Sequence, residues 1–189
     1  MNNIVVTGGG SGGHIAPIRA ITPELLKTKK LIWIGSSDFE KNAAADLGIK
    51  FKKIASGKMR RGISFGNIVK NIIDIFRVEY GAWQSLFFLL KTKPEKVFST
   101  GGFVSVPVVI AAWLLRIPII IHEQTIGFGL ANKIVASVAH KILLAFPESK
   151  KYIPEKHHFK VEVVGNPIRA DLTNGSFEGL QGFLKTDLS

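Results

Sequence analysis

The chain has 189 residues, of which 46% are hydrophobic and 21% charged, with a formal net charge of +11. This length is enough for one buried core, so we expect one main domain, and the lack of cysteine excludes disulfides and thiolate metal sites. The start of the sequence has no basic segment followed by an apolar stretch, so we expect no signal peptide. The basic excess indicates an anionic partner, either a phosphorylated substrate, membrane lipid or nucleic acid.

The first expected element is a short strand over 4–6, which leads into a loop with five glycines in residues 8–13 and then His14. Glycines allow a ligand to approach the backbone, and a following helix directs unpaired N–H groups towards it. The loop therefore predicts a phosphate or diphosphate site. Its spacing also fits a dinucleotide site, but the acidic residue that would bind a ribose is missing after the second strand. A glycine turn without a ligand is the remaining alternative.

Seven runs are typical of strands, and several of them are apolar throughout: 4–6, 31–34, 51–54, 97–99, 119–121, 142–145 and 161–164. Helical patterns fill most of the gaps, which predicts an α/β fold with a Rossmann-like, doubly wound parallel sheet. We expect a helix over 16–27, with Pro17 in its first turn and a kink or break at Pro23. A second helix is expected over 38–47, capped by Asp38.

The segment 64–90 carries more apolar residues at helical spacing than one core-facing stripe needs. Between residues 50 and 96, eleven basic residues are opposed by three acidic ones. An apolar face bordered by positive charge is typical of a helix at a membrane surface, and a core helix with a solvated basic back is the alternative. The candidate membrane-surface residues are Ile72, Phe76, Trp83, Lys70 and Arg77. The longest apolar run, 103–121, is interrupted by prolines and is expected to form a helix and a strand rather than a membrane span.

Three further polar motifs each follow an expected strand. A second glycine turn over 99–105 offers N–H groups and hydroxyls to an anion. The sequence His-Glu-Gln-Thr over 122–125 lies where catalytic residues are common in a parallel sheet. The last motif, over 165–169, ends in Arg169, which could bind a phosphate or a carboxylate.

Together, in this order and spacing, the motifs at 9–14, 101–105, 122–124 and 165–169 resemble those of the MurG family of peptidoglycan N-acetylglucosaminyltransferases. The resemblance covers about residues 1–170. It implies the N-terminal half of a GT-B glycosyltransferase, in which two Rossmann-like domains face each other across a cleft. Residues 1–170 would be the acceptor-binding domain, and 171–189 a linker or the start of a missing C-terminal donor domain.

The resemblance implies an inverting transfer of N-acetylglucosamine from UDP-N-acetylglucosamine to the C4 hydroxyl of undecaprenyl-pyrophosphoryl-N-acetylmuramoyl pentapeptide. That acceptor is lipid I, and the product is lipid II. The family implies no resident cofactor or metal, no nucleic acid, and a peripheral position on the cytoplasmic face of an anionic membrane. Without the C-terminal domain we expect this chain to be inactive. A non-catalytic module that binds lipid-linked precursors and a related lipid glycosyltransferase remain alternatives.

A glycosyl transfer needs a base for the acceptor hydroxyl, and His14 and Glu123 are the candidates, with Glu123 as the base or as the residue that orients it. The residues expected to bind the donor, by resemblance, are Ser11, Gly12, Gly13, Thr125 and Arg169. The residues expected to bind the acceptor diphosphate are Gly10, Gly101, Gly102 and Ser105. Two positions depart from the family: it usually has asparagine where Thr125 stands, and often tyrosine where Phe103 stands.

Overall fold

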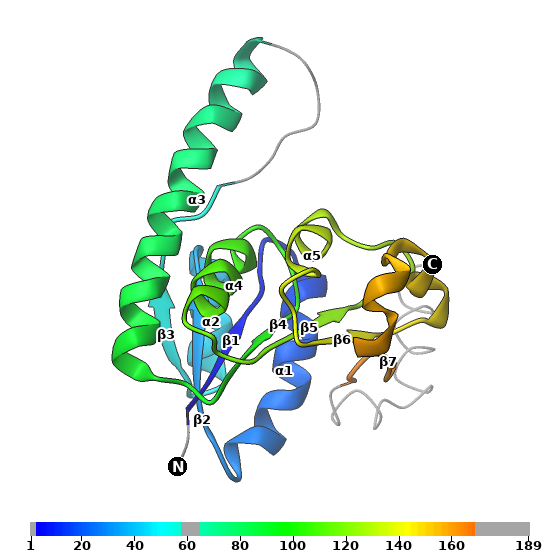
Figure 1. Cartoon of the computed structure of the whole chain (residues 1–189). Coiled ribbons are helices and arrows are strands. Elements are labelled where there is room, and N and C mark those ends of the chain that lie inside the picture. The colour runs from blue at the N-terminus through cyan, green and yellow to red at the C-terminus, as the bar shows by residue number, and fades with distance from the viewer. Residues whose placement is uncertain (1–2, 58–64, 169–189) are drawn as a thin grey trace, which may run out of the picture.

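The computed structural model of the chain describes residues 3–57 and 65–168. Its described strands form one parallel sheet in the order β3-β2-β1-β4-β5-β6-β7 (Figure 1). The strands are β1 (Asn3–Thr7), β2 (Lys30–Gly35), β3 (Lys50–Lys53), β4 (Lys96–Ser99), β5 (Ile119–Glu123), β6 (Lys141–Leu144) and β7 (Val161–Val163). The predicted doubly wound parallel sheet and all seven predicted strands are confirmed.

Helices cover both faces of this sheet (Figure 1). The helices are α1 (Gly12–Leu26), α2 (Asp38–Asp46), α3 (Phe65–Thr92), α4 (Ser105–Leu114) and α5 (Leu130–Val135), with the short 3₁₀ helices η1 (Pro147–Tyr152) and η2 (Glu155–Lys160). One face packs against α1 and α2. The other packs against α4 and α5, and α3 lies on the outside of α4. As expected, the run 103–121 divides into a helix and a strand.

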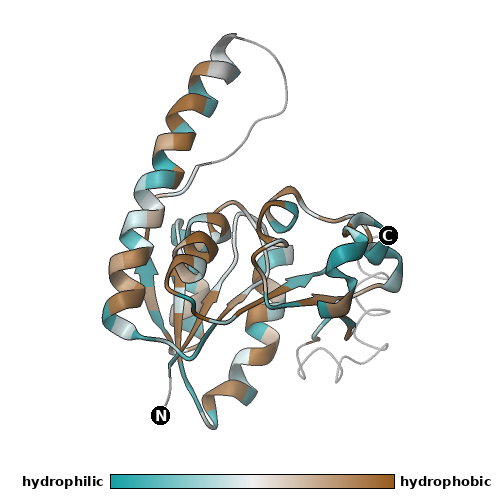
Figure 2. Cartoon of the chain, viewed as in Figure 1, coloured by the Kyte–Doolittle hydropathy of each residue, from teal (hydrophilic) through white to brown (hydrophobic). Residues whose placement is uncertain are grey.

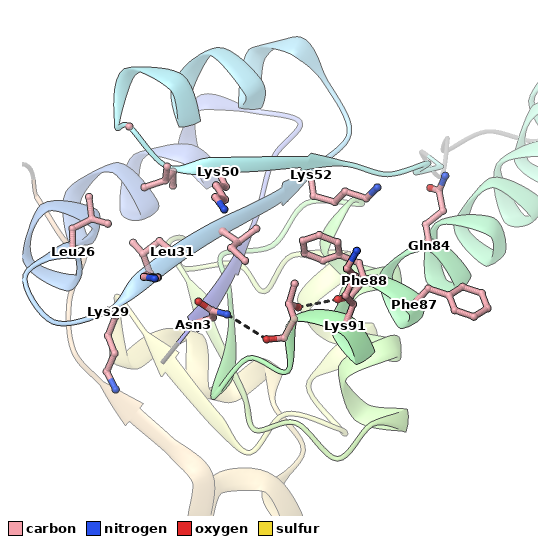
Figure 3. A pocket seen from close by; sticks show the side chains of 15 residues that line it. Asn3, Leu26, Lys29, Leu31, Lys50, Lys52, Gln84, Phe87, Phe88 and Lys91 are labelled. Carbon is pink, nitrogen blue, oxygen red and sulfur yellow. Dashed lines mark hydrogen bonds between the residues drawn. The ribbon is translucent and has the colours of Figure 1, made fainter. Parts of the chain in front are cut away.

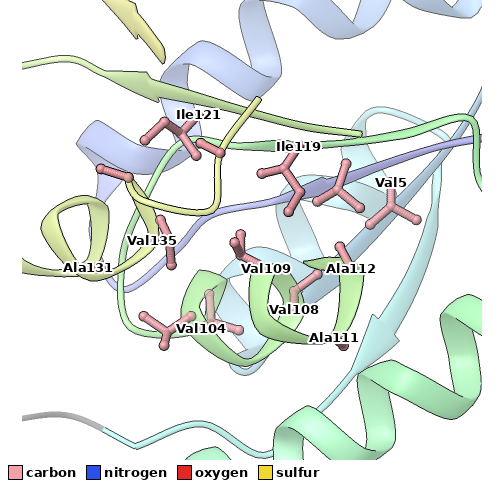
Figure 4. Close-up of a cluster of buried hydrophobic side chains, with 14 of the residues drawn as sticks. Val5, Val104, Val108, Val109, Ala111, Ala112, Ile119, Ile121, Ala131 and Val135 are labelled. Atoms are coloured by element: carbon pink, nitrogen blue, oxygen red, sulfur yellow. The ribbon is translucent and has the colours of Figure 1, made fainter. Parts of the chain in front are cut away.

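The core has two parts because neighbouring residues of a strand point to opposite faces of the sheet. In β1, Val5 packs with α4 and α5 in one cluster, whereas Ile4 and Val6 pack with α1 and α2 in the other (Figure 4). Trp33 in β2 is fully buried in the second cluster, and its indole N–H donates to the carbonyl of Gly8 at 3.2 Å. The glycine loop is thereby attached to the core on the side of α1.

The predicted start of α1 was wrong, because the helix begins at Gly12 rather than Ala16 and Pro17 therefore lies in the second turn. Of the kink or break expected at Pro23, the break does not occur, because the helix continues to Leu26. Glycine is a poor helix former, and here tertiary contact outweighs that propensity, because the Thr100 hydroxyl donates to the carbonyl of His14 at 2.5 Å. Pro23 lies near the end of α1, where a missing N–H removes only one helical hydrogen bond.

The predicted cap of α2 was also wrong by one residue. Ser37, and not Asp38, is the N-cap, and it forms a capping box with Glu40. The Ser37 hydroxyl accepts from the Glu40 N–H at 3.5 Å, and the Glu40 carboxylate accepts from the Ser37 N–H at 2.7 Å. The helix stops before Gly48, which has a φ of +66°, a conformation that favours glycine at a helix end.

The 28-residue helix α3 packs along α4 with its C-terminal half, whereas its N-terminal half extends beyond the sheet (Figure 1). Within residues 3–57 and 65–168, no helix combines the length and the hydropathy needed to cross a bilayer.

Candidate active site

The two predicted glycine turns meet at the carboxyl ends of β1 and β4. The Gly9 N–H donates to the Gly101 carbonyl at 3.3 Å, and the Thr100 N–H donates to the Thr7 carbonyl at 2.9 Å. Gly102 has a φ of +82°, and a Cβ at this position would lie 2.1 Å from the carbonyl oxygen of Gly9. Only glycine fits there, because the two backbones are already in contact.

A buried glutamate that the sequence analysis did not identify holds the first glycine loop. The Glu40 side chain is fully buried, and its carboxylate accepts from the N–H groups of Gly10 (2.9 Å), Ser36 (2.7 Å) and Ser37 (2.7 Å). The spacing of Ser37 and Glu40 is a capping-box signal that was readable in the sequence. This carboxylate lies between the glycine loop and the end of β2. Because it already accepts from three backbone N–H groups, it does not suit the ribose of a dinucleotide, which disfavours that alternative.

The imidazole of His14 is oriented by two oxygen atoms. Its Nδ1 lies 2.8 Å from the carbonyl oxygen of Thr100 and 3.2 Å from Oε1 of Gln124. Both oxygens can only accept, so Nδ1 carries the proton in the neutral ring and Nε2 has a lone pair. His14 is in the first turn of α1 and lines a cavity of about 320 Å³ together with Gly10 and Gly102.

The predicted His-Glu-Gln motif supports this orientation through a chain of hydrogen bonds. The Gln124 amide nitrogen lies 2.8 Å from the carbonyl oxygen of His122 and 3.1 Å from its Nδ1, which leaves Oε1 directed at His14. The other ring nitrogen of His122 lies 3.0 Å from the carbonyl oxygen of Gly165. Burial lowers the pKa of His122 below its ordinary value of 6.5, against the opposing effects of the Gly165 carbonyl and of Glu123. A neutral His122 fits both of its hydrogen bonds.

All four sequence motifs are therefore connected. The first and second motifs meet at Gly9, the first and third at His14, and the third and fourth at His122. The Asn166 side chain adds a second link, because it donates to the carbonyl oxygen of Gln124 at 3.1 Å.

Glu123, the other candidate base, lies in a different environment. It is 2% exposed, and its carboxylate accepts from the Thr125 N–H (3.2 Å), the Gly129 N–H (2.8 Å) and the Asn132 amide (3.0 Å). The hydroxyl of Thr125 lies 2.8 Å from the same carboxylate and 2.5 Å from the carbonyl of Gly127. Glu123 does not line the cavity at His14, and this arrangement supports a role in holding the 125–132 loop rather than in proton transfer.

Of the predicted diphosphate-binding residues, some line the cavity at His14 and others pack beside it. Gly10 and Gly102 line the cavity beside His14, whereas Gly101 packs against the imidazole ring itself. Ser105 is buried and donates its hydroxyl to the Gly102 carbonyl at 2.7 Å, so it stabilises the turn.

The predicted donor-binding residues are also dispersed around the site. Ser11 lines the same cavity, and Gly13 is exposed at the start of α1. Gly12 lines a neighbouring cavity of about 440 Å³ with Phe39 and Pro167. Arg169 lies outside the described residues.

A cation from α3 also reaches the cavity at His14. Arg77 lines it, and its guanidinium contacts the carboxylate of Asp74 at 3.2 Å while the side chain remains 60% exposed. The sequence analysis assigned Arg77 to the membrane surface, whereas the fold brings it to the glycine loops. The cavity is thus lined by glycine backbone, an imidazole and a guanidinium.

A cavity of about 1130 Å³ lies at the opposite ends of the strands (Figure 3). It is bordered by lysines from several elements, including Lys29, Lys50, Lys52 and Lys91. None of the four sequence motifs contributes a residue to it, so it is separate from the candidate active site.

A family model described as "Glycosyltransferase family 28 N-terminal domain" matches residues 4–144. A curated relative from Lachnospira eligens is 47% identical over 178 residues, covering 93% of this chain and 48% of the relative. Another from Treponema pallidum is 41% identical over 187 residues, covering 97% and 48%. Both are named UDP-N-acetylglucosamine–N-acetylmuramyl-(pentapeptide) pyrophosphoryl-undecaprenol N-acetylglucosamine transferase. The chain spans about half the length of these relatives.

Solved structures give the same fold. The crystal structure of Acinetobacter baumannii MurG aligns with a TM-score of 0.71 at 24% identity, covering 90% of this chain and 47% of that one. A Staphylococcus aureus MnaA–UDP structure aligns with a TM-score of 0.63 at 16% identity, covering 88% and 44%. In each case the similarity extends over slightly less than half of the solved chain.

Proposed function

Because the chain belongs to glycosyltransferase family 28, as a match to its N-terminal domain, we propose that it is the acceptor-binding half of an N-acetylglucosaminyltransferase. The acceptor is lipid I and the product lipid II, in agreement with the names of the relatives. The observation that carries the proposal is the cavity at His14, where four separate motifs are joined by hydrogen bonds. The donor half is supplied by a second domain.

The acceptor diphosphate binds in this cavity, between the two glycine turns and Arg77. Backbone N–H groups near the start of α1 suit an anion, and a guanidinium can bind two phosphate oxygens at once. Gly10 and Gly102 contribute no side chain, so the diphosphate can lie directly on the backbone.

His14 acts as the base. Its Nδ1–H is held by Thr100 and Gln124, so Nε2 accepts the proton of the sugar C4 hydroxyl. The hydroxyl oxygen then bonds to C1 of N-acetylglucosamine, and the bond from C1 to UDP breaks with its electrons on the leaving phosphate. Glu123 acts as a positioning residue for the adjoining loop.

The donor approaches from the rim formed by Ser11, Gly12 and Gly13, which are exposed at the start of α1. Arg169 is kept as a donor ligand on the resemblance alone. Thr125 contributes less than an asparagine would, because its hydroxyl is turned towards Glu123 and Gly127.

The chain binds the membrane through the outer face of α3. The exposed apolar residues Val69, Ile72, Phe76, Tyr80, Trp83, Phe87 and Leu90 recur every three or four positions, and Ile73 adjoins Ile72. This spacing places them on one side of the helix, opposite the buried Asp74, Gly81, Ser85 and Leu89. We call this set the outer stripe, and Figure 2 shows that hydrophobic and hydrophilic segments alternate along α3.

The size and surroundings of the outer stripe support contact with an anionic bilayer. It runs about 30 Å along α3 at a rise of about 1.5 Å per residue. The exposed cations Lys70 and Lys91 border it. Exposed apolar area of this extent, combined with positive charge, suits the cytoplasmic leaflet, where the lipid-linked acceptor is held.

The test of the proposal is a fusion of this chain to the C-terminal half of the Lachnospira eligens relative. We expect this fusion to transfer N-acetylglucosamine to a lipid I analogue, and the unfused chain to show no transfer. The variant His14→Ala should lower turnover of the fusion by about 10²- to 10⁴-fold, which is the usual contribution of a general base.

The matched control is His157→Ala, which removes a histidine from η2, outside the site, and should leave turnover unchanged. Full activity of the His14→Ala fusion would remove this residue from the mechanism. A fusion that binds lipid I but gives no transfer would favour the non-catalytic module instead.

A further inference from the structure

A second cavity of about 170 Å³ adjoins the cavity at His14. The two share Gly57, Asp74 and Phe103, so one continues into the other. The first contains glycine backbone, Arg77 and His14, whereas the second is lined mainly by apolar side chains.

The apolar lining comes from three different elements. Ile75 and Val78 project from α3, Val106 lies in the first turn of α4, and Ile134 belongs to α5. Phe103 closes the side that borders the glycine turn. Ile75 is 60% exposed and Ile134 is 45% exposed, so the cavity is open to solvent beside α3.

His14, the glycine turns and Arg77 line the first cavity, and the apolar side chains line the second, with Gly57, Asp74 and Phe103 at the junction. A ligand that fills both must therefore carry a sugar, an anion and a hydrocarbon in that order. A nucleotide-sugar does not have this order, because both of its ends are polar. A sugar joined through a diphosphate to a prenyl chain does.

We propose that the apolar cavity binds the first isoprene unit of the prenyl diphosphate whose diphosphate lies in the cavity at His14. This inference rests on the proposed function for the position of the diphosphate. A volume of about 170 Å³ suits one isoprene unit of five carbons, if each heavy atom occupies about 30 Å³, as a liquid water does. The rest of a long chain stays outside, next to the outer stripe.

The pocket makes the prenyl chain part of what this domain recognises. Removing apolar carbons from water stabilises binding in proportion to the area buried. The first unit lies in the cavity and should add affinity, whereas later units lie outside it and should add little. The acceptor would then be bound by its diphosphate and its first unit together, independently of the membrane.

The experiment measures binding of the full 189-residue chain by calorimetry, without membranes. The probes are inorganic diphosphate, dimethylallyl diphosphate and geranyl diphosphate. We expect affinity to rise about tenfold from inorganic to dimethylallyl diphosphate, and to change less than threefold from dimethylallyl to geranyl diphosphate.

Two neutral variants, Ile75→Gln and Ile134→Gln, place an amide in the apolar cavity without adding charge. Each should abolish most of the tenfold gain and leave the affinity for inorganic diphosphate unchanged. The matched control is Leu114→Gln, because Leu114 is 58% exposed and lies at the end of α4 outside both cavities. All three positions are partly exposed, so the variants are expected to fold, and circular dichroism checks this.

The outcomes separate the two proposals. If inorganic diphosphate binds but the prenyl group adds nothing, the apolar pocket is rejected and the diphosphate site stands. The same rejection follows if the gain survives in both cavity variants. If no diphosphate binds at all, the proposed acceptor site is rejected together with this inference.

Discussion

The glycine turns and the outer stripe of α3 are the two proposed binding surfaces, one for the diphosphate and one for the membrane, and they are built in opposite ways. At the glycine turns, hydrogen bonds join residues far apart in the chain, such as His14 with Thr100 and with Gln124. On the outer stripe, the residues are neighbours along one helix and their apolar side chains are exposed. Recognition of one hydroxyl and one diphosphate requires fixed positions, whereas attachment to a bilayer requires only area and charge.

Among the variants that test this comparison, we expect the largest effect for a substitution of Glu40, on the free energy of unfolding. The variant Glu40→Ala removes the acceptor for three backbone N–H groups, so it should lower the free energy of unfolding by about 3–5 kcal/mol. Chemical denaturation measures this. The control Glu24→Ala breaks an exposed ion pair with Lys27 and should change stability by less than about 1 kcal/mol. Equal effects of the two variants would mean that the glycine loop does not depend on Glu40.

An intermediate effect is expected on the outer stripe. Phe76 is 65% exposed, so Phe76→Glu should leave folding intact and weaken binding to anionic vesicles by about tenfold, since it removes apolar area and adds a negative charge. Vesicle sedimentation at low and high salt measures this. The control Phe159→Glu changes an 85% exposed phenylalanine on η2 and adds the same charge. If both variants lose binding equally, net charge rather than the stripe determines attachment.

The smallest effect concerns the pH dependence of stability. Burial lowers the pKa of His122 in the folded chain, so below its ordinary value of 6.5 the unfolded chain takes up a proton that the folded chain does not. Stability contributed by this residue is therefore complete above pH 6.5 and falls as the pH drops towards the lowered pKa. Denaturation at pH 7.5 and 5.5 should show this loss, and His122→Gln should reduce it. An unchanged slope in that variant would place the titration elsewhere.

The central strands were predictable because they are short apolar runs covered on both faces, as in Ile119–Ile121 and Val97–Ser99. The motif residues were predictable as a group, because each motif follows a strand. Their separate roles were not, because the sequence does not give contacts such as that between His14 and Gln124, which are 110 residues apart.

Glu123 illustrates the same limit. In the sequence it is a carboxylate after a buried strand, equally suited to act as a base or as an orienting residue. Only the positions of Gly129 and Asn132 make its carboxylate a buried acceptor. The start of α1 was missed for a related reason, because propensity disfavours the glycines there and a contact from Thr100 holds them.

The position of Arg77 on α3 bears on the distance between the bilayer surface and the proposed site of the acceptor diphosphate. A helix with its side chains is about 10–12 Å thick, and Arg77, seven residues after Lys70, lies on the flank of α3 that borders the outer stripe. With α3 resting on the headgroups as proposed, the proposed diphosphate site would stand less than one helix thickness above them. A phosphate joined directly to a lipid could reach that height without the hydrocarbon tail leaving the leaflet, so α3 would set the distance between the bilayer and the reacting sugar.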